Sequence, residues 1–405
     1  MSYLSSRLAA VKPSASMAVS QAAKALVAKG IDVIDLGLGE PDFATPAHIT
    51  EAAYAAAKAG DTLYTAALGT LDLRKAITRK FEQENGLSYT PDEIIVSNGA
   101  KQIIFNALMA TLEDGDEVIV PTPYFVSYPE MVKLLGGTPV IAQCREEDGF
   151  RLTADVLEQA ITPKTKWLFL NAPGNPSGAV YDEASLQALG EVLQRHPHVL
   201  VLSDEIYEHI VFDGVAFVSF GKACPQLKDR SLIVNGMSKA YAMTGWRVGY
   251  AAGPLPLIKA MATVQSQSIT SVCSIAQAAA KAALDGPQES VREFCAAFQR
   301  RRDQVVRGIN AIQGLNLRAP QGAFYAFIGC ADLIGMKTPD GTILQDDAGI
   351  ATYLLNEGRV AAVPGSAYGM SPYFRISTAT SDSVLDEAMK RIANAVSRLA
   401  PATKA

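Results

Sequence analysis

The chain has 405 residues, 49% of them hydrophobic and 19% charged, and its formal net charge at pH 7 is −5. This length exceeds what one core usually fills, so we expect a globular protein with one large and one smaller domain. The acidic balance argues against nucleic acid as a partner, because such binding depends on clustered Lys and Arg. No apolar stretch reaches the roughly 18 residues that a membrane span needs, and the first residues lack the apolar core of a signal peptide.

The first 47 residues contain three prolines around a short strand-like stretch at residues 31–36 (IDVIDL). We expect this segment to form an arm that packs with the C-terminal part of the chain.

Five short apolar runs in the middle of the chain are predicted to be buried strands. They are Ile94–Ser97, Glu117–Val120, Trp167–Leu170, Val199–Leu202 and Leu232–Val234. Helix-like segments lie between them, such as Lys101–Leu112 and Glu183–Arg195. Continuous apolar strands separated by helices indicate a mainly parallel α/β sheet.

Helical sequence then runs from Pro254 to about Gly314, and after it strands and helices mix. The elements predicted there are Ala323–Ile328, Gly349–Glu357, Val360–Val363, Tyr373–Ser377 and Ser383–Leu399. We therefore place a domain change near Arg300. The predicted division is an arm plus part of the small domain over residues 1–47, a large domain over 48–300 and a small α+β domain over 301–405.

The cysteines are scattered along the chain at Cys144, Cys224, Cys273, Cys295 and Cys330. None forms a C-x-x-C pair and their number is odd, so we expect neither a disulfide framework nor a metal site. A reducing cytoplasm is the predicted location.

The segment Ser97–Gln102 (SNGAKQ) follows a predicted strand and opens a helix. Glycine at such a junction lets the backbone approach an anion, and the helix N-terminus offers free N–H groups to a phosphate. A tight turn punctuated by glycine is the alternative.

The segment Asn171–Gly178 (NAPGNPSG) holds a loop at a strand's carboxyl end, where open α/β sheets bind ligands. Asn175 would hydrogen-bond a ring hydroxyl there. A rigid Asx-type turn is the alternative.

The segment Ser203–Glu208 (SDEIYE) also follows a strand. A carboxylate at a strand end can pair with a protonated ring nitrogen, which makes a pyridinium a stronger electron sink. Asp204 and Tyr207 would then face the same bound ring. Capping of a following helix by Ser203 or Asp204 is the alternative.

The segment Ser238–Arg247 (SKAYAMTGWR) follows the last of these strands. A lysine beside a cation has a depressed pKa and acts as a nucleophile or base, which suggests Lys239. Arg247 would reach back to hold a phosphate in a two-bond fork. A solvated loop is the alternative, but the segment is rich in apolar residues, where an unpaired lysine would be costly.

Together the four strand ends fit an anionic, carbonyl-bearing aromatic ring with a basic nitrogen. Segments along nearly the whole chain resemble class I aminotransferases of pyridoxal-phosphate (PLP) fold type I, and most of all the bacterial branch of aspartate aminotransferases. These segments are Lys12–Ser20 (KPSASMAVS), Gly39–Phe43 (GEPDF), Gly99–Gln102, Pro123–Met131, Asn175–Tyr181, Ser203–Phe212, Ser238–Pro254, Gly322–Phe327 (GAFYAF) and Phe374–Thr380 (FRISTAT). The resemblance implies a large domain with a mainly parallel seven-stranded sheet and a smaller α+β domain.

The resemblance assigns the cofactor's chemistry to four side chains. Lys239 would hold PLP covalently and move the proton at the substrate Cα. Asp204 would pair with the pyridine nitrogen, and Asn175 and Tyr207 would bind the ring oxygen. The implied reaction moves an amino group between an L-amino acid, aspartate or glutamate, and a 2-oxo acid such as 2-oxoglutarate, with ping-pong kinetics.

The resemblance also implies where the cofactor's phosphate would lie. It would meet the backbone amides of Ala100 and Lys101, the Arg247 guanidinium and Tyr64 of the partner subunit. Ser238 also belongs to the implied cofactor site. The implied active form is therefore a homodimer with sites shared across the interface.

For the substrate, the resemblance implies that Arg375 takes the α-carboxylate in a planar fork that lysine could not reproduce. The backbone at Gly39 would close over the substrate. Lys101, Ser14 and Ser16 would meet the distal carboxylate of a dicarboxylic substrate.

Phe125 is a departure, because it stands where the family pattern has a tryptophan. It can stack on the cofactor, but it has no indole N–H to donate to a substrate. Phe125 and Asn175 also border the implied substrate site, so the side-chain specificity stays open. The alternative is an aromatic amino acid or prephenate aminotransferase. A non-transaminating PLP enzyme or a PLP-fold binding protein is less favoured, because the chain keeps both Lys239 and Arg375.

Overall fold

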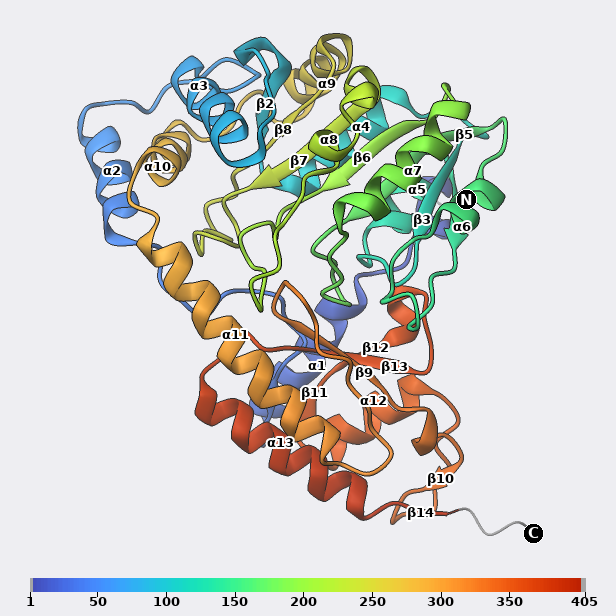
Figure 1. Ribbon diagram of the computed structural model, residues 1–405. Helices are drawn as coiled ribbons and strands as arrows, with labels where there is room; N and C mark the ends of the chain where they lie inside the picture. The colour runs from blue at the N-terminus through green and yellow to red at the C-terminus, as the bar shows by residue number, and fades with distance from the viewer. Residues whose placement is uncertain (1–2, 402–405) are drawn as a thin grey trace.

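The computed structural model describes residues 3–401, which form a larger upper lobe and a smaller lower lobe (Figure 1). The upper lobe is built on one seven-stranded sheet with the strand order β2-β8-β7-β6-β5-β3-β4. Its strands are β2 (Ile94–Ser97), β3 (Glu117–Pro121), β4 (Thr138–Ala142), β5 (Thr165–Asn171), β6 (Leu200–Asp204), β7 (Ser231–Gly236) and β8 (Gly249–Ala252). β8 runs antiparallel to both of its neighbours, and the other pairings are parallel. The predicted mainly parallel sheet and all five predicted strands are confirmed; β4 and β8 were not predicted.

The strands are apolar throughout because helices cover both faces of the sheet. Trp167 and Phe169 of β5 pack into the cluster on the side of α4 and α9. The alternate residues Leu168 and Leu170 pack into the cluster on the side of α7. Both predicted helices in this region form, as α4 and α7. The helices of the upper lobe are α2 (Ala47–Lys58), α3 (Leu71–Lys80), α4 (Ala100–Thr111), α5 (Tyr128–Leu134), α6 (Ala154–Ala160), α7 (Glu183–Arg195), α8 (Phe220–Ala223), α9 (Leu255–Ser268) and α10 (Ser274–Asp285).

The lower lobe contains a three-stranded antiparallel sheet in the order β12-β13-β9 and two small pairs, β1 with β11 and β10 with β14. Its strands are β1 (Ile34–Asp35), β9 (Tyr325–Gly329), β10 (Met336–Lys337), β11 (Val360–Ala361), β12 (Val363–Pro364), β13 (Tyr373–Ser377) and β14 (Ala400–Pro401). Its helices are α1 (Ala15–Val27), α12 (Asp347–Asn356) and α13 (Asp382–Ser397), together with the lower part of α11 (Glu289–Asn310). The prediction of one strand over Val360–Val363 is wrong, because the chain changes partner there: β11 pairs with β1, whereas β12 pairs with β13.

The N-terminal segment joins the lower lobe as expected. Ile34 pairs in register with Val360, and the buried Leu36 belongs to the hydrophobic cluster of that lobe. The Ser377 amide also donates to the carbonyl of Leu36 at 2.8 Å. This pairing brings residues 37–43 to the space between the two lobes.

α11 is continuous across the predicted domain change at Arg300. We propose that the boundary lies within this helix, with residues 48–300 in the large domain and residues 1–47 and 301–405 in the arm and small domain. The outermost residues of that division, 1–2 and 402–405, lie outside the described residues.

The five cysteines are free. None of the helices within residues 3–401 has both the length and the hydrophobicity that crossing a bilayer requires.

Candidate active site

A cavity of about 410 Å³ lies between the lobes, at the carboxyl ends of β5, β6 and β7. The start of α4 borders it from the upper lobe, and β9 and β13 border it from the lower lobe. Open α/β sheets place their ligands at this edge. The predicted site residues that line the cavity are Ser16, Gly39, Ala100, Lys101, Phe125, Asn175, Asp204, Tyr207, Ser238, Lys239, Arg247 and Arg375.

Two predicted residues do not line this cavity. Ser14 occupies the N-cap of α1 without a side-chain capping bond. Tyr64 is 88% exposed on the surface of this chain.

Lys239 lies just after β7 and points into the cavity, where its Nζ donates to the carbonyl of Gly39 at 2.6 Å. Burial lowers the pKa of Lys239 to about 8; the carboxylate of Glu40 opposes this shift, and the guanidinium of Arg375 adds to it. An amine with a pKa near neutrality is a competent nucleophile and base, because part of it carries a free electron pair.

Asp204 ends β6 and is buried in the cavity wall. Tyr128 donates to its Oδ2 at 2.6 Å, and the Ile206 amide donates to its Oδ1 at 3.3 Å. Burial raises the pKa of the Asp204 carboxyl to about 6, although the bond from Tyr128 opposes the rise. Within the described part of the chain, Asp204 forms no ion pair with a lysine or arginine, so a cationic ring nitrogen would supply what it lacks.

Asn175 is held in the wall by its neighbour Asn171. The Asn171 Oδ1 accepts from the Asn175 amide at 2.8 Å, and its Nδ2 donates to the carbonyl of Asp204 at 3.0 Å. Strand pairing sets Asn171 opposite Asp204, so the two strand ends fix each other. The side chain of Asn175 is thereby presented to the cavity.

The start of α4 forms a cradle for an anion. The first N–H groups of a helix have no partner within it, which leaves the amides at Ala100 and Lys101 free for a ligand. Two glycines make the approach possible. A Cβ on Gly249 would lie 2.3 Å from the Ala100 nitrogen, and a Cβ on Gly99 would lie 2.5 Å from Nη2 of Arg247.

Arg247 extends over this cradle and donates to the carbonyls of Thr244 and Asn98 at 2.9 and 3.1 Å. Its backbone is left-handed, with a φ of 56°, which is uncommon for a residue other than glycine. Such strain is concentrated at functional sites. The guanidinium and the helix N-terminus both favour a phosphate here.

Arg375 lies on β13 and is only 2% exposed. One Nη donates to the Oδ1 of Asn175 at 3.2 Å, and the other donates to the carbonyl of Gly37. Its Nε has no hydrogen-bond partner within residues 3–401, and no carboxylate there forms an ion pair with the guanidinium. A buried cation without an anion is costly, so this site fits a carboxylate ligand.

Lys101 and Phe125 lie together in the cavity wall. The Lys101 Nζ lies 5.1 Å from the centre of the Phe125 ring. Burial lowers the pKa of Lys101, and the nearby Arg247 lowers it further. Ser16 on α1 also lines the cavity.

Several lining residues were not predicted, among them Tyr128, Tyr325 and Glu40. Each belongs to a segment that carried the family resemblance, Pro123–Met131, Gly322–Phe327 or Gly39–Phe43. Their positions depend on tertiary packing, and periodicity does not show where a hydroxyl or carboxylate points.

The residues present fit PLP. A buried carboxylate without a cation, a helix N-terminus under an arginine, and a lysine with a lowered pKa all face one cavity. They match a ring nitrogen, a phosphate and an aldehyde, respectively.

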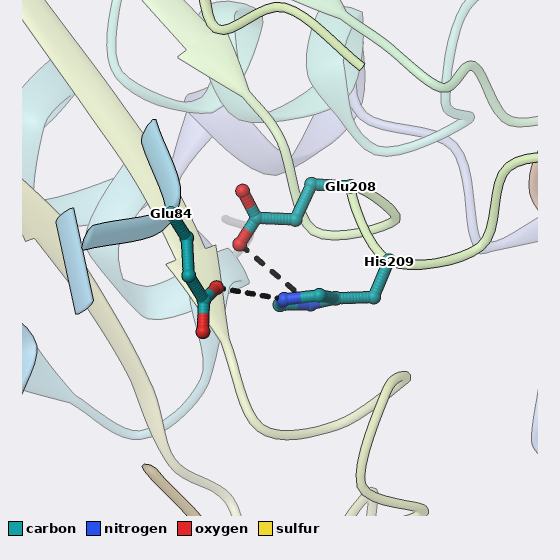
Figure 2. Close-up of side chains that lie close together, drawn as sticks. All are labelled: Glu84, Glu208 and His209. Atoms are coloured by element: carbon teal, nitrogen blue, oxygen red, sulfur yellow. Dashed lines mark hydrogen bonds and ion pairs between the residues drawn. The ribbon is translucent and has the colours of Figure 1, made fainter. Parts of the chain in front are cut away.

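A second polar cluster is formed by Lys80, Glu84, Asn85, Glu208, His209 and Asn235. None of these residues lines the cavity. In Figure 2 the imidazole of His209 faces the carboxylates of both Glu84 and Glu208. These three groups have donor atoms that suit a metal, but the Lys80 ammonium already contacts both carboxylates. The cluster therefore carries its own counter-cation.

We expect Lys80→Met to lower the free energy of unfolding by about 3–5 kcal/mol, because it leaves the Glu208 carboxylate buried and unpaired. Glu208 is 5% exposed and also accepts from Asn85 and Asn235 at 2.7 and 2.6 Å. Urea unfolding would measure the loss. The double variant Lys80→Met/Glu208→Gln should lose less than the sum of the single variants. Lys281→Ala, which breaks an exposed pair with Asp285, is the control and should cost less than about 0.5 kcal/mol.

The same pair sets a pH dependence. Burial alone would raise the pKa of Glu208, but Lys80 and His209 lower it to about 2. Because the folded pKa lies below the unfolded value of about 4.3, the pair's stabilisation is complete above that value and declines as the pH falls towards 2. Glu208→Gln should flatten the stability profile in this range, and an unchanged slope would contradict the assignment.

Comparison with known proteins agrees with this geometry. Residues 31–392 match the model of the family described as aminotransferase class I and II. The chain is 55% identical over 394 residues to an aspartate aminotransferase of Rhizobium meliloti, covering 97% of this chain and 96% of that protein. It is 54% identical over 392 residues to an aspartate/prephenate aminotransferase of Cereibacter sphaeroides, covering 97% and 98%.

The fold is likewise similar to a solved structure. The crystal structure of the Rhizobium meliloti aspartate aminotransferase superposes with a TM-score of 0.97 at 54% identity, covering 99% of this chain and all of that one. The predicted family, fold and cofactor are confirmed. The chain belongs to the class I and II aminotransferase family and is a PLP-dependent aminotransferase.

Proposed function

We propose that this enzyme moves the amino group between a dicarboxylic L-amino acid, aspartate or glutamate, and a 2-oxo acid such as 2-oxoglutarate. The observation that carries the proposal is the placement of Lys239, Asp204 and Arg375 around one cavity, where Arg375 has no anionic partner among the described residues. The relatives named above include an aspartate aminotransferase and an aspartate/prephenate aminotransferase, which supports an acidic substrate.

When bound, PLP supplies a sink for the electrons that are released as the substrate's Cα–H bond breaks. Lys239 holds the cofactor covalently and then removes and returns the Cα proton, for which its lowered pKa suits it. Asp204 keeps the ring nitrogen protonated. Asn175 and Tyr207 would bind the ring hydroxyl oxygen, and Phe125 would contact the ring.

Other residues orient the ligands. Ala100, Lys101, Ser238 and Arg247 hold the phosphate, the first two through their backbone amides. The Gly39 backbone would cover the substrate, and its carbonyl accepts a hydrogen bond from the Lys239 ammonium. Because one site serves both half-reactions in turn, ping-pong kinetics are expected.

A half-reaction panel tests the substrate class. The PLP form is mixed with aspartate, glutamate, alanine, phenylalanine or arogenate, and the loss of the visible band is timed. Aspartate and glutamate should react fastest. If phenylalanine or arogenate leads, the alternative of an aromatic or prephenate aminotransferase replaces the proposal.

The distal carboxylate of such a substrate would meet Lys101, with Ser14 and Ser16 contributing hydroxyls. Ser16 lines the cavity, whereas Ser14 lies two residues earlier at the N-cap of α1. The Lys101 ammonium at the start of α4 is unfavourably placed for the helix dipole, and Arg247 lies near it. An anionic ligand would offset both the unfavourable interaction with the helix dipole and the repulsion between Lys101 and Arg247.

We expect Lys101→Ala to raise the KM for aspartate and glutamate by about ten- to a hundredfold, because it removes a charge-assisted contact worth roughly 1.5–3 kcal/mol. The KM for phenylalanine, which has no distal carboxylate, should change far less and serves as the internal control. Lys101→Arg should recover part of the loss. Equal increases for all three substrates would exclude the distal-carboxylate role.

We also propose that the active form is a homodimer in which Tyr64 of the partner subunit reaches the phosphate. Tyr64 is 88% exposed and Leu63 80% exposed, which suits a surface covered by a second copy. Tyr64→Phe should weaken cofactor retention on dialysis without changing the far-UV spectrum. Sedimentation of a fully active monomer at assay concentration would rule the proposal out.

A reducing cytoplasm remains the proposed location. The five free cysteines support it, since a protein exposed to oxidation would be expected to pair them.

A further inference from the structure

Tyr325 is a buried residue of the cavity wall that comes from the lower lobe. It opens β9 and is 2% exposed. β9 pairs with β13 so that Phe327 faces Arg375 and Tyr325 faces Ser377. Tyr325 and Arg375 are therefore diagonal neighbours on one face of the sheet.

The ring of Tyr325 supports the carboxylate-binding guanidinium. The Arg375 Cζ lies 4.6 Å from the centre of this ring. Within the described residues Arg375 has no carboxylate partner, so it is held by this face, by the more distant ring of Tyr368 at 5.3 Å and by two hydrogen bonds. The contact with Tyr325 helps to fix the orientation of the Arg375 guanidinium before a substrate binds.

The hydroxyl of Tyr325 contacts two other parts of the site. It lies 2.7 Å from the hydroxyl of Tyr207, which comes from the upper lobe. It also lies against the segment that covers the cavity: a Cβ on Gly39 would be 2.0 Å from it. The carbonyl of that same Gly39 accepts from Lys239.

We infer that Tyr325 is a positioning residue that holds the Arg375 fork with its ring and, with its hydroxyl, directs the Tyr207 proton towards the cofactor's ring oxygen. The inference rests on the proposed function. It assigns Tyr325 the donor role in the bond to Tyr207, because a Tyr207 that gives its proton to the cofactor can only accept from Tyr325.

This arrangement strengthens Tyr207 as a donor, because a hydroxyl that accepts one hydrogen bond donates another more strongly. A stronger donor stabilises negative charge on the ring oxygen and lowers the pH midpoint of the cofactor's visible band. The charged and titratable groups that face this position are Asp204, Lys239 and Arg375, with Glu40 and Arg247 next to Lys239. None of them changes when the Tyr325 hydroxyl is removed.

Tyr325→Phe tests the hydroxyl alone. Absorbance titration of the holoenzyme should show the midpoint raised by about half a pH unit. The KM for the amino donor should stay within about twofold, because the ring under Arg375 remains. The matched control is Tyr353→Phe, which removes a buried hydroxyl bonded to the Ala395 carbonyl in the same lobe and should leave the midpoint unchanged.

Tyr325→Leu tests the ring. It should raise the midpoint as Tyr325→Phe does and also raise KM by about five- to thirtyfold, since the shorter of the two cation–π contacts of Arg375 is lost and only the one with Tyr368 remains. An unchanged or lowered midpoint in Tyr325→Phe overturns the inference, and so does an equal rise in KM for both variants. A wild-type protein with PLP that gives no visible band would instead refute the proposed function.

Discussion

Replacement of Lys239 by alanine is expected to lower turnover by at least about 10⁴-fold, the upper range for a single proton-transfer group. The loss should reach this size because one side chain has two proposed tasks, holding the cofactor and moving the Cα proton. The fold should survive. The Lys239 ammonium is desolvated in the wild-type protein and makes a single hydrogen bond to Gly39, so its removal deletes little that stabilises the native state.

Three measurements separate these effects. Single-turnover mixing with aspartate gives the chemical rate, and thermal unfolding reports the fold. Borohydride reduction of the PLP form followed by peptide mapping should label Lys239 in the wild-type protein. Lys228→Ala removes a surface lysine outside the cavity and should leave all three unchanged. A label on another lysine would show that the assignment is wrong.

The fold could be predicted where sequence pattern and burial coincide. Strands such as Trp167–Leu170 are apolar at every position because both faces of the sheet are covered. An uninterrupted apolar run is therefore enough to identify such a strand. β8 was missed because Gly249–Ala252 (GYAA) has no β-branched residue. Its small residues serve another need, since Gly249 lets the start of α4 approach. The division of Val360–Val363 into β11 and β12 was missed because it depends on pairing with segments that are distant in the sequence, β1 for β11 and β13 for β12.

The candidate site could be predicted to a similar extent, namely for the residues that lie at strand ends. Asp204 ends β6 and Lys239 comes shortly after β7, and the carboxyl ends of these parallel strands meet at one edge of the sheet. Tyr128 and Tyr325 could not be assigned in this way. One reaches Asp204 from a neighbouring helix, and the other reaches Tyr207 from a different lobe. A hydroxyl's partner across such distances in sequence depends on packing that no local pattern encodes.

The two lobes thus supply different halves of the chemistry. The upper lobe provides the groups proposed to hold the cofactor, Lys239 and Asp204 among them. The lower lobe provides Arg375 and Tyr325. A change in Arg375 should therefore affect substrate binding and leave the cofactor in place.

Arg375→Lys should raise the KM for every amino donor by about a hundredfold, because lysine cannot make the two parallel bonds of the guanidinium fork. Losing one charge-assisted bond of roughly 3 kcal/mol corresponds to that factor. Spectrophotometric titration of the PLP form should show undiminished cofactor binding. Since Arg375 has no anionic partner among the described residues, its replacement should not lower the melting temperature.

The contrast with Arg302 makes this prediction specific. Arg302 is as deeply buried as Arg375, but it already binds Asp213 through two bonds of 2.8 and 2.7 Å and the carbonyl of Pro320. Arg302→Lys should therefore lower the melting temperature and leave KM unchanged, the reverse of Arg375→Lys. A buried arginine with an anionic partner in the fold stabilises the protein, whereas Arg375, which has no anionic partner among the described residues, is proposed to bind an anionic ligand. If both variants lower stability and neither raises KM, the substrate carboxylate does not bind at Arg375.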